Sequence, residues 1–495
     1  MTEADNTSLS QLLDAVCATF AQQGFETARV DTHISTVLLV GDAAYKFKKP
    51  VDFGFLDFST LAQRAHFCQR EVLLNRRFAP DVYKGVVPIT HGDDGVALAG
   101  TGPIVEYAVW MRRFEHSQQL DVLIEVGDLA TSDIEALGQT LGALHLAAPS
   151  AAACYGTAAM AHAQIAAPGV ALARAVPSLQ DSLALFRARL DAASAALAGR
   201  HAGGFIRDCH GDLHASNIVR LDGDWTPFDC IEFNDELRFI DSVSDFAFLL
   251  MDFEFRAANS FANSLRNAYL QACGDYGGLV LLPLYCAYRS LVRALVAELE
   301  RQHTDGGAQS RLAARRDHHI TLAVQYLAEK PPPRLLITHG LSGSGKSWLS
   351  RQLAAREGQI VLCSDLERRR LNGVTALGTT ASALNAGIYQ ESTTVQTYAE
   401  LARLGEIVIT AGYSVIIDAA FLHRDQRAQF RQLAEALNCD FEIINCEADP
   451  EVLKARISTR GARGNDPSEA NLAVLAQQMS TQEPLTAEEW SYVRP

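Results

Sequence analysis

Apolar and polar residues near the amino terminus follow the pattern of a hairpin and a helix. Residues Thr36–Val40 and Ala43–Lys48 alternate with the two-residue period of half-buried strands, and the Gly-Asp pair between them is typical of a tight turn. A helix is predicted over 61–78, and 106–113 is predicted to be a strand that runs into a hinge. The pattern therefore indicates a small sheet with a helix early in the chain.

Helical patterns dominate the middle of the chain and end at three consecutive prolines. The alanine-rich segment 151–200 is predicted to be helical, and in 290–327 apolar residues recur at steps of three and four. Pro331, Pro332 and Pro333 cannot continue a helix, because proline lacks the amide donor and restricts the residue before it. A domain boundary is therefore predicted at the prolines.

Beyond the prolines, short apolar strands alternate with helices, beginning with the apolar run 334–339. This alternation is typical of an α/β domain with a doubly wound parallel sheet. The expected organisation is a first domain over 1–330 with a small lobe over about 25–112 and a large lobe over about 113–330, a linker over 331–333, and a second domain over 334–495.

Composition excludes several classes of protein. The chain has 495 residues, 48% of them hydrophobic, which favours two or three cores over one. Its 43 basic and 58 acidic residues give a net charge of −15, which argues against a surface that binds phosphate backbones everywhere. No apolar stretch is long enough to span a bilayer and no secretory pattern opens the chain. The ten cysteines form no CxxC pair, so we expect a soluble cytoplasmic protein with reduced thiols.

Charge is divided unevenly at the prolines. Residues 334–495 hold 16 basic and 19 acidic residues, a net charge of −3, which leaves −12 for the part before them. Of those 16 basic residues 14 are arginine, whose planar fork suits phosphate groups. The second domain is therefore compatible with a phosphorylated or nucleotide-like substrate, whereas the acidic first domain suits a neutral or cationic one.

A phosphate-binding loop is predicted between the first strand and the first helix of the second domain. The segment GLSGSGKS matches GxxxxGK[ST] in full and has the required strand before it and helix after it. Its glycines let backbone amides close around phosphate, its lysine reaches the outer phosphates, and its last hydroxyl binds magnesium. The predicted nucleotide-binding residues are Gly340, Ser342, Gly343, Ser344, Gly345, Lys346 and Ser347, with Ser347 also a magnesium ligand.

Three further features of this domain bear charge. Asp418 ends an apolar strand, where it would hold magnesium, although a strand-end turn aspartate is the alternative. Asp365 follows another strand, at the sheet edge where ligands gather, although it could equally cap a helix. Arginines that would close over a transferring phosphoryl group follow on a late helix. These are Arg456, Arg460 and Arg463.

These motifs resemble the P-loop kinases of the polynucleotide-kinase, zeta-toxin and gluconate-kinase type. The resemblance rests on Gly340–Ser347, on Asp365 and Arg368 in Asp-x-x-Arg, and on Asp418 with the arginine-rich segment. It implies that Asp365 activates or orients a substrate hydroxyl and that Arg368 steadies it. The acceptor classes left open are a free small hydroxyl compound, a nucleotide sugar and a nucleic-acid 5′ end.

A second constellation lies in the first domain. In HGDLHASN, Asp212 and Asn217 have the spacing of the kinase catalytic loop, in which the acid accepts a hydroxyl proton and the amide holds magnesium. Asp229 supplies a further magnesium ligand. Lys46 lies on a strand and would reach the nucleotide phosphates, with Lys48 on the same face as the alternative.

On the helix that follows the lysine strand, Glu71 would orient that lysine, although a solvated glutamate is equally compatible with the pattern. These residues resemble the aminoglycoside-phosphotransferase and choline-kinase-like family. The resemblance implies an α+β protein-kinase-like domain and a role for Asp245 in supporting the catalytic loop. The chain departs from the kinase pattern in one respect, since no GxGxxG precedes Lys46.

Together, the motifs favour an ATP- and Mg²⁺-dependent phosphotransferase with two kinase sites. The first alternative keeps only the phosphate loop active and makes the amino-terminal domain a substrate-binding or regulatory module. A metal-dependent hydrolase using His210, Asp212 and His214 is a second alternative for the first domain, and an inactive retained fold is a third. A nucleotide-gated interaction protein without turnover is a fourth. Oligomeric state is not indicated by the sequence.

Overall fold

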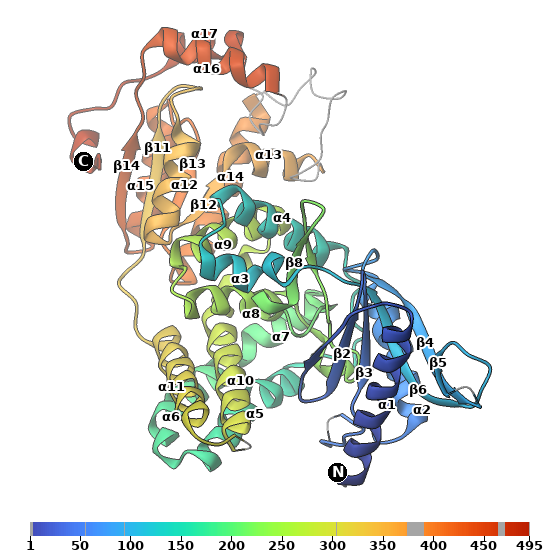
Figure 1. Cartoon of the computed structure of the whole chain (residues 1–495). Coiled ribbons are helices and arrows are strands. Elements are labelled where there is room, and N and C mark those ends of the chain that lie inside the picture. The colour runs from blue at the N-terminus through green and yellow to red at the C-terminus, as the bar shows by residue number, and fades with distance from the viewer. Residues whose placement is uncertain are drawn as a thin grey trace. The chain divides into compact units, whose positions relative to one another are not determined.

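The computed structural model describes residues 3–54, 56–93, 95–302, 304–373, 391–463 and 471–494 (Figure 1). The chain forms two compact units. The first consists of Met1–Leu129, Ala148–Ala161 and Ala198–Asp252, and the second of Ala130–Ala147, His162–Leu197 and Phe253–Pro495. The chain passes from one unit to the other on either side of 130–147, and again within α5 (Ala158–Ala175), α7 (Ser194–Ala202) and α8 (Ser242–Phe255).

The first unit is built on a six-stranded antiparallel sheet with the order β1-β2-β3-β6-β4-β5, and it also contains two small two-stranded sheets, β7 with β10 and β8 with β9. Its remaining elements are α1 (Glu3–Gln22), β1 (Thr27–Asp31), β2 (Ser35–Val40), β3 (Ala43–Lys48), α2 (Leu61–Asn75), β4 (Tyr83–Gly92), β5 (Gly95–Leu98), β6 (Ile104–Arg112), η1 (His116–Gln118), α3 (Leu120–Val126), β7 (Ile206–Asp208), η3 (Ala215–Asn217), β8 (Ile218–Leu221), β9 (Asp224–Pro227), η4 (Asp235–Leu237) and β10 (Phe239–Asp241).

The predicted hairpin and helix of the small lobe are confirmed. Strands β2 and β3 pair as antiparallel neighbours up to Val40 and Ala43, with the Gly-Asp turn between them. Helix α2 begins after Thr60, whose side chain and that of Gln63 form a capping box. It ends at Asn75, three residues before the predicted end, because beyond it the amides of Arg77 and Phe78 donate to the backbone oxygens of Leu74 and Asn75, three residues back, so the chain continues as turns.

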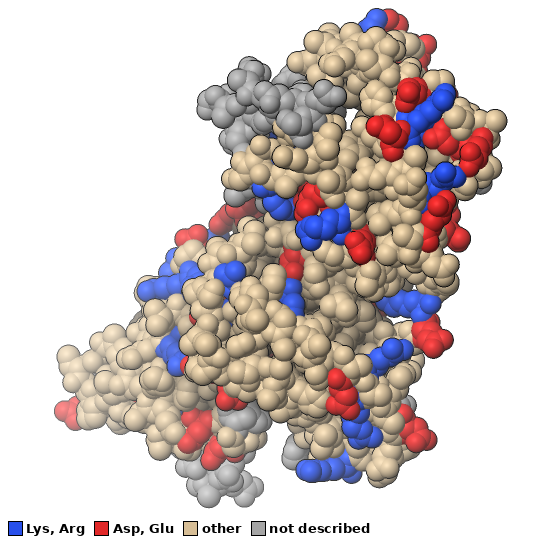
Figure 2. All heavy atoms as spheres, turned by 180° about the vertical axis from the view of Figure 1, so that it is seen from behind, with Lys and Arg blue, Asp and Glu red and all other residues tan. Residues whose placement is uncertain are grey.

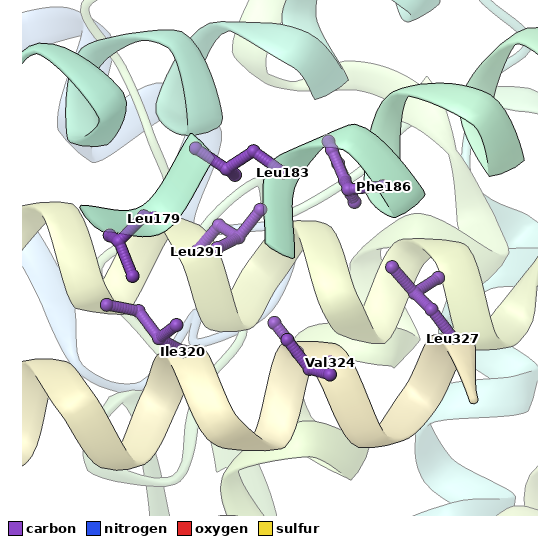
Figure 3. Close-up of a pocket in the computed structure, with 8 residues that line it drawn as sticks. Leu179, Leu183, Phe186, Leu291, Ile320, Val324 and Leu327 are labelled. Carbon is purple, nitrogen blue, oxygen red and sulfur yellow. The ribbon is translucent and has the colours of Figure 1, made fainter. Parts of the chain in front are cut away.

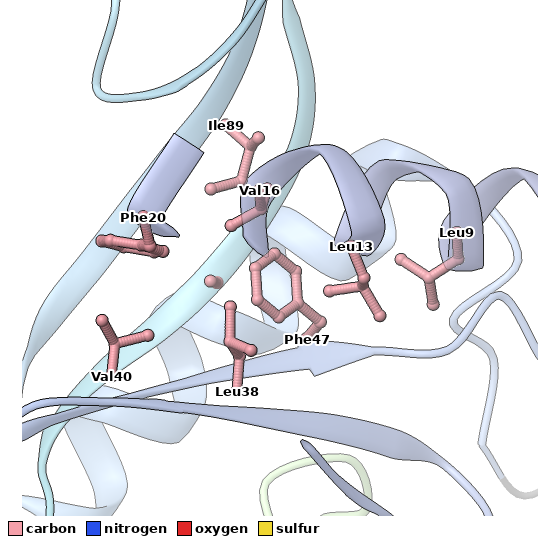
Figure 4. Close-up of a cluster of buried hydrophobic side chains, with 9 residues drawn as sticks. Leu9, Leu13, Val16, Phe20, Leu38, Val40, Phe47 and Ile89 are labelled. Carbon is pink, nitrogen blue, oxygen red and sulfur yellow. The ribbon is translucent and has the colours of Figure 1, made fainter. Parts of the chain in front are cut away.

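Helix α1 covers one face of the sheet with an apolar stripe (Figure 4). Side chains on β3 alternate between the two faces, so Phe47, which packs against α1, leaves Lys46 and Lys48 on the opposite face. This packing therefore decides which face of the sheet can carry the lysine site. The cluster consists of Leu9, Leu13, Val16, Phe20, Leu38, Val40, Phe47, Ile89 and Ala108.

The second unit contains a four-stranded parallel sheet with the order β12-β13-β11-β14, together with helices (Figure 1). The predicted doubly wound parallel-sheet fold is confirmed. Its elements are α4 (Thr131–Ala147), η2 (Pro177–Leu179), α6 (Gln180–Ala192), α9 (Asn259–Cys273), η5 (Tyr276–Val280), α10 (Leu282–Gln302), α11 (Gly307–Leu327), β11 (Arg334–His339), α12 (Lys346–Glu357), β12 (Ile360–Cys363), α13 (Ser364–Leu371), α14 (Glu391–Thr410), β13 (Val415–Asp418), α15 (Arg424–Ala436), β14 (Asp440–Asn445), α16 (Pro450–Arg463), α17 (Leu472–Thr481) and η6 (Glu489–Tyr492).

Two predicted helical segments are interrupted in the structure. The segment 290–327 is divided between α10 and α11, and Gly306, with φ +67°, precedes the second helix. Only glycine adopts that backbone conformation without strain. The segment 151–200 is divided into α5, α6 and α7, with Pro177 at the start of the 3-10 turn before α6. Local breakers therefore override helical periodicity at both places.

An apolar pocket lies between η2, α6, α10 and α11 of the second unit (Figure 3). Leu183, Leu291 and Val324 are among its lining residues, all of which are leucine, isoleucine, valine, alanine or phenylalanine. A lining of this kind offers no group to orient a hydroxyl or to hold a phosphate. The pocket is therefore not part of either candidate site.

Two surface properties bear on possible partners. On the face shown in Figure 2, the described lysines and arginines are dispersed and several lie beside acidic residues. This face therefore presents no continuous basic area for a nucleic-acid backbone. Among the described residues, no helix combines the length and the apolar character needed to cross a membrane.

Candidate active sites

Five charged side chains, four of them buried and the fifth, Asp229, partly exposed, form a chain of ion pairs in the first unit. The two oxygens of Glu71 are shared between two strand lysines: Lys46 Nζ lies 2.9 Å from one oxygen and Lys48 Nζ lies 2.7 Å from the other. Lys46 also pairs with Asp229, and Lys48 with Glu232. The predicted lysine, glutamate and aspartate therefore lie in direct contact, and both candidate lysines contact the same glutamate.

The charges in this chain stabilise one another. Burial raises the pKa of Glu71, but the two ammonium groups outweigh burial and lower it to about 2. Burial lowers the pKa of each lysine, and the carboxylates around Lys46 and Lys48 more than compensate, so both pKa values are raised. For Glu232, burial raises the pKa and Lys48 counteracts it only in part. Lys46 and Glu71 are therefore both ionised at neutral pH.

The segment that carries Asp229 is fixed to the small lobe by backbone hydrogen bonds as well. Asp229 has φ +61°, and its amide donates to the hydroxyl oxygen of Tyr83 on β4 at 3.0 Å. The next amide, of Cys230, donates to Asn75 Oδ1 at 2.8 Å. Because Asn75 ends α2, the helix that carries Glu71 also positions the segment that carries Asp229.

Two buried acids hold the catalytic loop. The carboxylate of Asp245, which is fully buried, accepts the amides of His210 and Gly211, each at 2.9 Å. Asp252 accepts the amide of Ala215 at 3.0 Å. Carboxylates that accept backbone amides fix a loop firmly, because hydrogen bonds to an ionised acceptor are strong. The support expected of Asp245 from the family resemblance thus has a geometric basis.

Asp212 and Asn217 lie together within this loop. Asn217 Nδ2 donates to the backbone oxygen of Asp212 at 3.0 Å and to Asp212 Oδ2 at 3.1 Å. The side chains of Asp212 and Asp229 are 40% and 39% exposed, so both carboxylates can be reached from outside. His210 Nε2 instead shares a 2.8 Å hydrogen bond with the backbone oxygen of Phe228, and His210 Nδ1 accepts the amide of Asp212 at 3.4 Å, so both ring nitrogens are engaged within the protein. These contacts disfavour a histidine-ligated hydrolase.

The phosphate loop of the second unit follows β11 and leads into α12. Two of its glycines are required by the geometry. At Gly340, with φ +146°, a Cβ would lie 2.3 Å from the backbone oxygen of Cys446. At Gly343, with φ +83°, a Cβ would lie 3.1 Å from the backbone oxygen of Leu453. Only glycine fits both positions, so the backbone amides can close into a phosphate cradle.

The charged residues at this loop gather at the carboxyl ends of the parallel strands. Lys346 Nζ donates to the backbone oxygens of Gly340 and Leu341, each at 2.8 Å. Asp418 ends β13 and is 5% exposed. Burial raises its pKa, while the Ser347 hydroxyl and the Lys346 ammonium act in the opposite direction. The magnesium-site candidates Ser347 and Asp418 are therefore neighbours.

The acceptor-side residues lie on α13. Asp365 and Arg368 form an ion pair at 3.0 Å, and the parallel register of Cys363 with Asp418 brings the start of α13 to the same sheet edge as Asp418. Arg456 on α16 donates to the backbone oxygen of Gly343 at 3.1 Å. The other two predicted arginines, Arg460 and Arg463, belong to the last turns of α16, and their side chains lie outside the described residues.

Three residues that sequence reasoning missed contact the candidate groups. Glu232 pairs with Lys48, Tyr83 accepts the amide of Asp229, and Gln478 Oε1 accepts the amide of Ser342 at 2.9 Å. Glu232 has a detectable signal, since it is an acid in the otherwise apolar run 230–233 just after Asp229. Tyr83 and Gln478 carry no comparable signal.

The residues present fit a nucleotide and a divalent cation at both sites. At the second site, the cradle would be filled by a Cβ at Gly340, and a hydroxyl and a carboxylate stand beside it. At the first site, the partly exposed carboxylate of Asp229 and the side-chain amide of Asn217 supply oxygen ligands, which suit Mg²⁺. When bound, the cation would neutralise charge on the phosphates.

Comparison with known families matches both parts of the chain. Residues 63–282 match the family described as Phosphotransferase enzyme family, and residues 335–485 match a family described as AAA domain. Uncharacterized proteins of Mycobacterium tuberculosis and Mycobacterium bovis are 31% identical over 462 residues, which cover 90% of this chain and 89% of each relative. The similarity therefore extends over both matched regions.

Two solved structures are similar to portions of this chain. A choline/ethanolamine kinase family protein from Mesorhizobium loti is 14% identical, with 63% of this chain and 99% of that chain covered and a TM-score of 0.34. A gluconokinase from Sinorhizobium meliloti 1021 is 18% identical, with 33% of this chain and 82% of that chain covered and a TM-score of 0.24.

Proposed function

This chain belongs to a family of two-domain phosphotransferases and is thus an ATP-dependent kinase, and we propose that both of its sites transfer phosphoryl groups. In this family a Phosphotransferase enzyme family domain is joined to a P-loop kinase domain. Each site would transfer the γ-phosphoryl of ATP to a hydroxyl, with Mg²⁺ as the cation. The observation that supports a working first site is the contact of Lys46 with Glu71, in which both charges are buried, together with its ion pair to the partly exposed Asp229. A fold retained without activity has no need to keep these charges buried, because burial of charges is costly.

At the first site, Asp212 serves as the proton acceptor for the substrate hydroxyl. Its carboxylate is oriented by Asn217 and remains accessible. Lys46, held ionised by Glu71, binds the nucleotide phosphates, while Asn217 and Asp229 hold the cation. These roles are positioning and charge neutralisation, which supply most of the catalysis in phosphoryl transfer.

At the second site, the loop amides and Lys346 bind the nucleotide phosphates, and Ser347 and Asp418 hold the cation. Asp365 orients the acceptor hydroxyl, and its ion pair with Arg368 holds the carboxylate in place. Arg456 is already hydrogen-bonded to the loop, and Arg460 and Arg463 follow it on the same helix. These arginines would neutralise charge on the transferring group.

The acceptor we propose for each site is a small-molecule or nucleotide-like hydroxyl compound. The second site's arginines favour a phosphorylated acceptor there. We also propose a cytoplasmic location, since none of the ten cysteines, all of which lie in the described part of the chain, forms a disulfide. Fractionation of producing cells, with detection of the chain by antibody, tests that location.

Isothermal titration of the full-length Lys346→Ala variant with MgATP tests whether the first site works. If both sites are kinases, this variant still binds one equivalent of MgATP and the further substitution Lys46→Met removes that binding. If Lys346→Ala binds no MgATP, the first domain is not a nucleotide site, and the single-site alternative replaces the proposal.

A further inference from the structure

Strand β12 lies at one end of the four-stranded sheet, and within the described part of the chain its single strand neighbour is β13. The backbone groups on its other side are hydrogen-bonded by side chains of α9. Asn267 Nδ2 donates to the backbone oxygen of Gln359 at 2.9 Å, and Asn267 Oδ1 accepts the amide of Val361 at 2.7 Å. One side-chain amide thus replaces the donor and the acceptor of a neighbouring strand.

The same helix makes further contacts of this kind in the second unit. Asn263 Nδ2 donates to the backbone oxygen of Ala355 at the end of α12, at 3.0 Å. Arg266 Nη2 donates to the backbone oxygen of Gly358 at 2.9 Å. Asn267 and Arg266 are only 8% and 6% exposed, so these hydrogen bonds are shielded from water. Helix α9 therefore supports the connection from α12 into β12 at successive positions.

Helix α13, which follows β12 directly, is held by the same region. Arg370 Nη2 donates to the backbone oxygen of Gln271 on α9 at 2.8 Å. Arg370 also pairs with Glu367, whose other oxygen accepts the hydroxyl of Tyr276 on η5 at 3.2 Å. Tyr276 and Glu367 are each 1% exposed. Two side chains of an eight-residue helix are thus fixed from outside the P-loop domain.

We propose that α9 and η5 are a working part of the second site, with Asn267 and Tyr276 as positioning residues for Asp365 and Arg368. Asp365 and Arg368 lie on the same short helix as Glu367 and Arg370, so a shift of that helix moves the acceptor-side residues. This inference rests on the function proposed for the second site. It gives a reason for joining the two domains in one chain, because α9 and η5 precede the proline linker and lie within the span that matches the Phosphotransferase enzyme family.

The test substitutes Asn267→Asp in the full chain, because a carboxylate cannot donate to the oxygen of Gln359. Amide hydrogen exchange over 360–371 is expected to become about tenfold faster, while exchange over β14 stays unchanged. Tyr276→Phe retains the ring and removes only the hydroxyl, so it provides a milder variant in which the unit keeps its core. Asn259→Ala, at an exposed asparagine on the same helix, is the matched control and should leave exchange unchanged.

Kinetic measurements then distinguish a change in the positions of Asp365 and Arg368 from a general loss of folded structure. In the Asp212→Asn background, ADP release from MgATP with water as acceptor reports the second site. Asn267→Asp and Tyr276→Phe are expected to lower kcat by about tenfold and by a few-fold respectively, with KM for MgATP within about twofold, because the phosphate loop itself is unaltered. Unchanged exchange over 360–371, or an unchanged kcat, overturns the inference. Absence of Lys346-dependent ADP release in the otherwise unsubstituted protein contradicts the proposed function instead.

Discussion

The two candidate sites are held together in different ways. The phosphate loop is eight consecutive residues whose shape is imposed by glycine backbone and by close backbone neighbours such as Cys446. The first site joins side chains that are far apart in sequence, since Lys46 meets Asp229 across 183 residues and Lys48 meets Glu232 across 184. One site therefore depends on local conformation, and the other depends on buried ion pairs between distant segments.

This difference has an energetic consequence. A strained or crowded loop loses binding when one backbone position is altered, but the surrounding sheet persists. A buried ion pair that loses one partner leaves an uncompensated charge, which destabilises the fold as well as the site. Substitutions at the first site should therefore lower the stability of the fold, whereas substitutions in the phosphate loop of the second site should mainly weaken nucleotide binding.

The largest expected effect is that of Glu71→Gln. Removing this carboxylate leaves two buried lysines with one acid each, and breaking a buried pair costs about 3–5 kcal/mol. The midpoint of urea unfolding of the first unit, followed by fluorescence, should fall markedly. Glu451→Gln, at an exposed pair with Lys454, is the control and should leave the midpoint unchanged. Equal midpoints for the two variants would show that the buried chain does not stabilise the unit.

Acid should weaken the same unit. The pKa of Glu71 lies at about 2 in the folded protein, below its ordinary value of 4.5, so its contribution is fully present above pH 4.5 and is lost as pH falls toward 2. Unfolding midpoints measured between about pH 6 and pH 3 should fall for the natural chain and change less for Glu71→Gln. Parallel pH profiles would argue against an ionised Glu71.

Gly340→Ala tests whether the second site depends on the backbone conformation of its phosphate loop. The new Cβ would lie 2.3 Å from the backbone oxygen of Cys446, so the loop must shift, and a misplacement of this size costs about 100-fold in turnover. Gly412→Ala also places a side chain at a positive φ, of +84°, but its Cβ meets nothing within 4 Å, and it should retain full turnover. A measurable loss in ADP release for both variants would assign the effect to strain in general.

Glu232→Gln should have the smallest effect. Lys48 keeps its hydrogen bond to Glu71, so only one charged contact is lost, a cost of about 1.5–3 kcal/mol. The urea midpoint of the first unit should therefore lie between those of the natural chain and Glu71→Gln. A midpoint below that of Glu71→Gln would reverse the order of importance of the two acids.

The difference between local conformation and contacts of distant segments also separates what could be predicted from the sequence from what could not. The phosphate loop and the hairpin of Lys46 are local patterns, and both folds could be inferred from motifs of eight or fewer residues. Glu232 could not be placed beside Lys48, because its role depends on contacts across 184 residues. Gly306 also shows the limit of periodicity, since a single backbone conformation divides a segment that reads as one helix.

The support of α13 by α9 could not be read from the sequence either. Asn263 and Asn267 lie at helical spacing, but asparagine on a helix is ordinarily a solvated residue. Only the position of β12 at the end of its sheet gives these amides backbone partners.

Transfer of label from γ-labelled ATP tests the central claim, that one chain holds two separable kinase sites. The full chain is incubated with labelled MgATP and a small-molecule extract, alongside Asp212→Asn and Lys346→Ala. Two labelled products are expected, of which Asp212→Asn loses one by about 10²–10⁴-fold and Lys346→Ala loses the other by about 10²–10³-fold. Loss of both products in either single variant would contradict the claim.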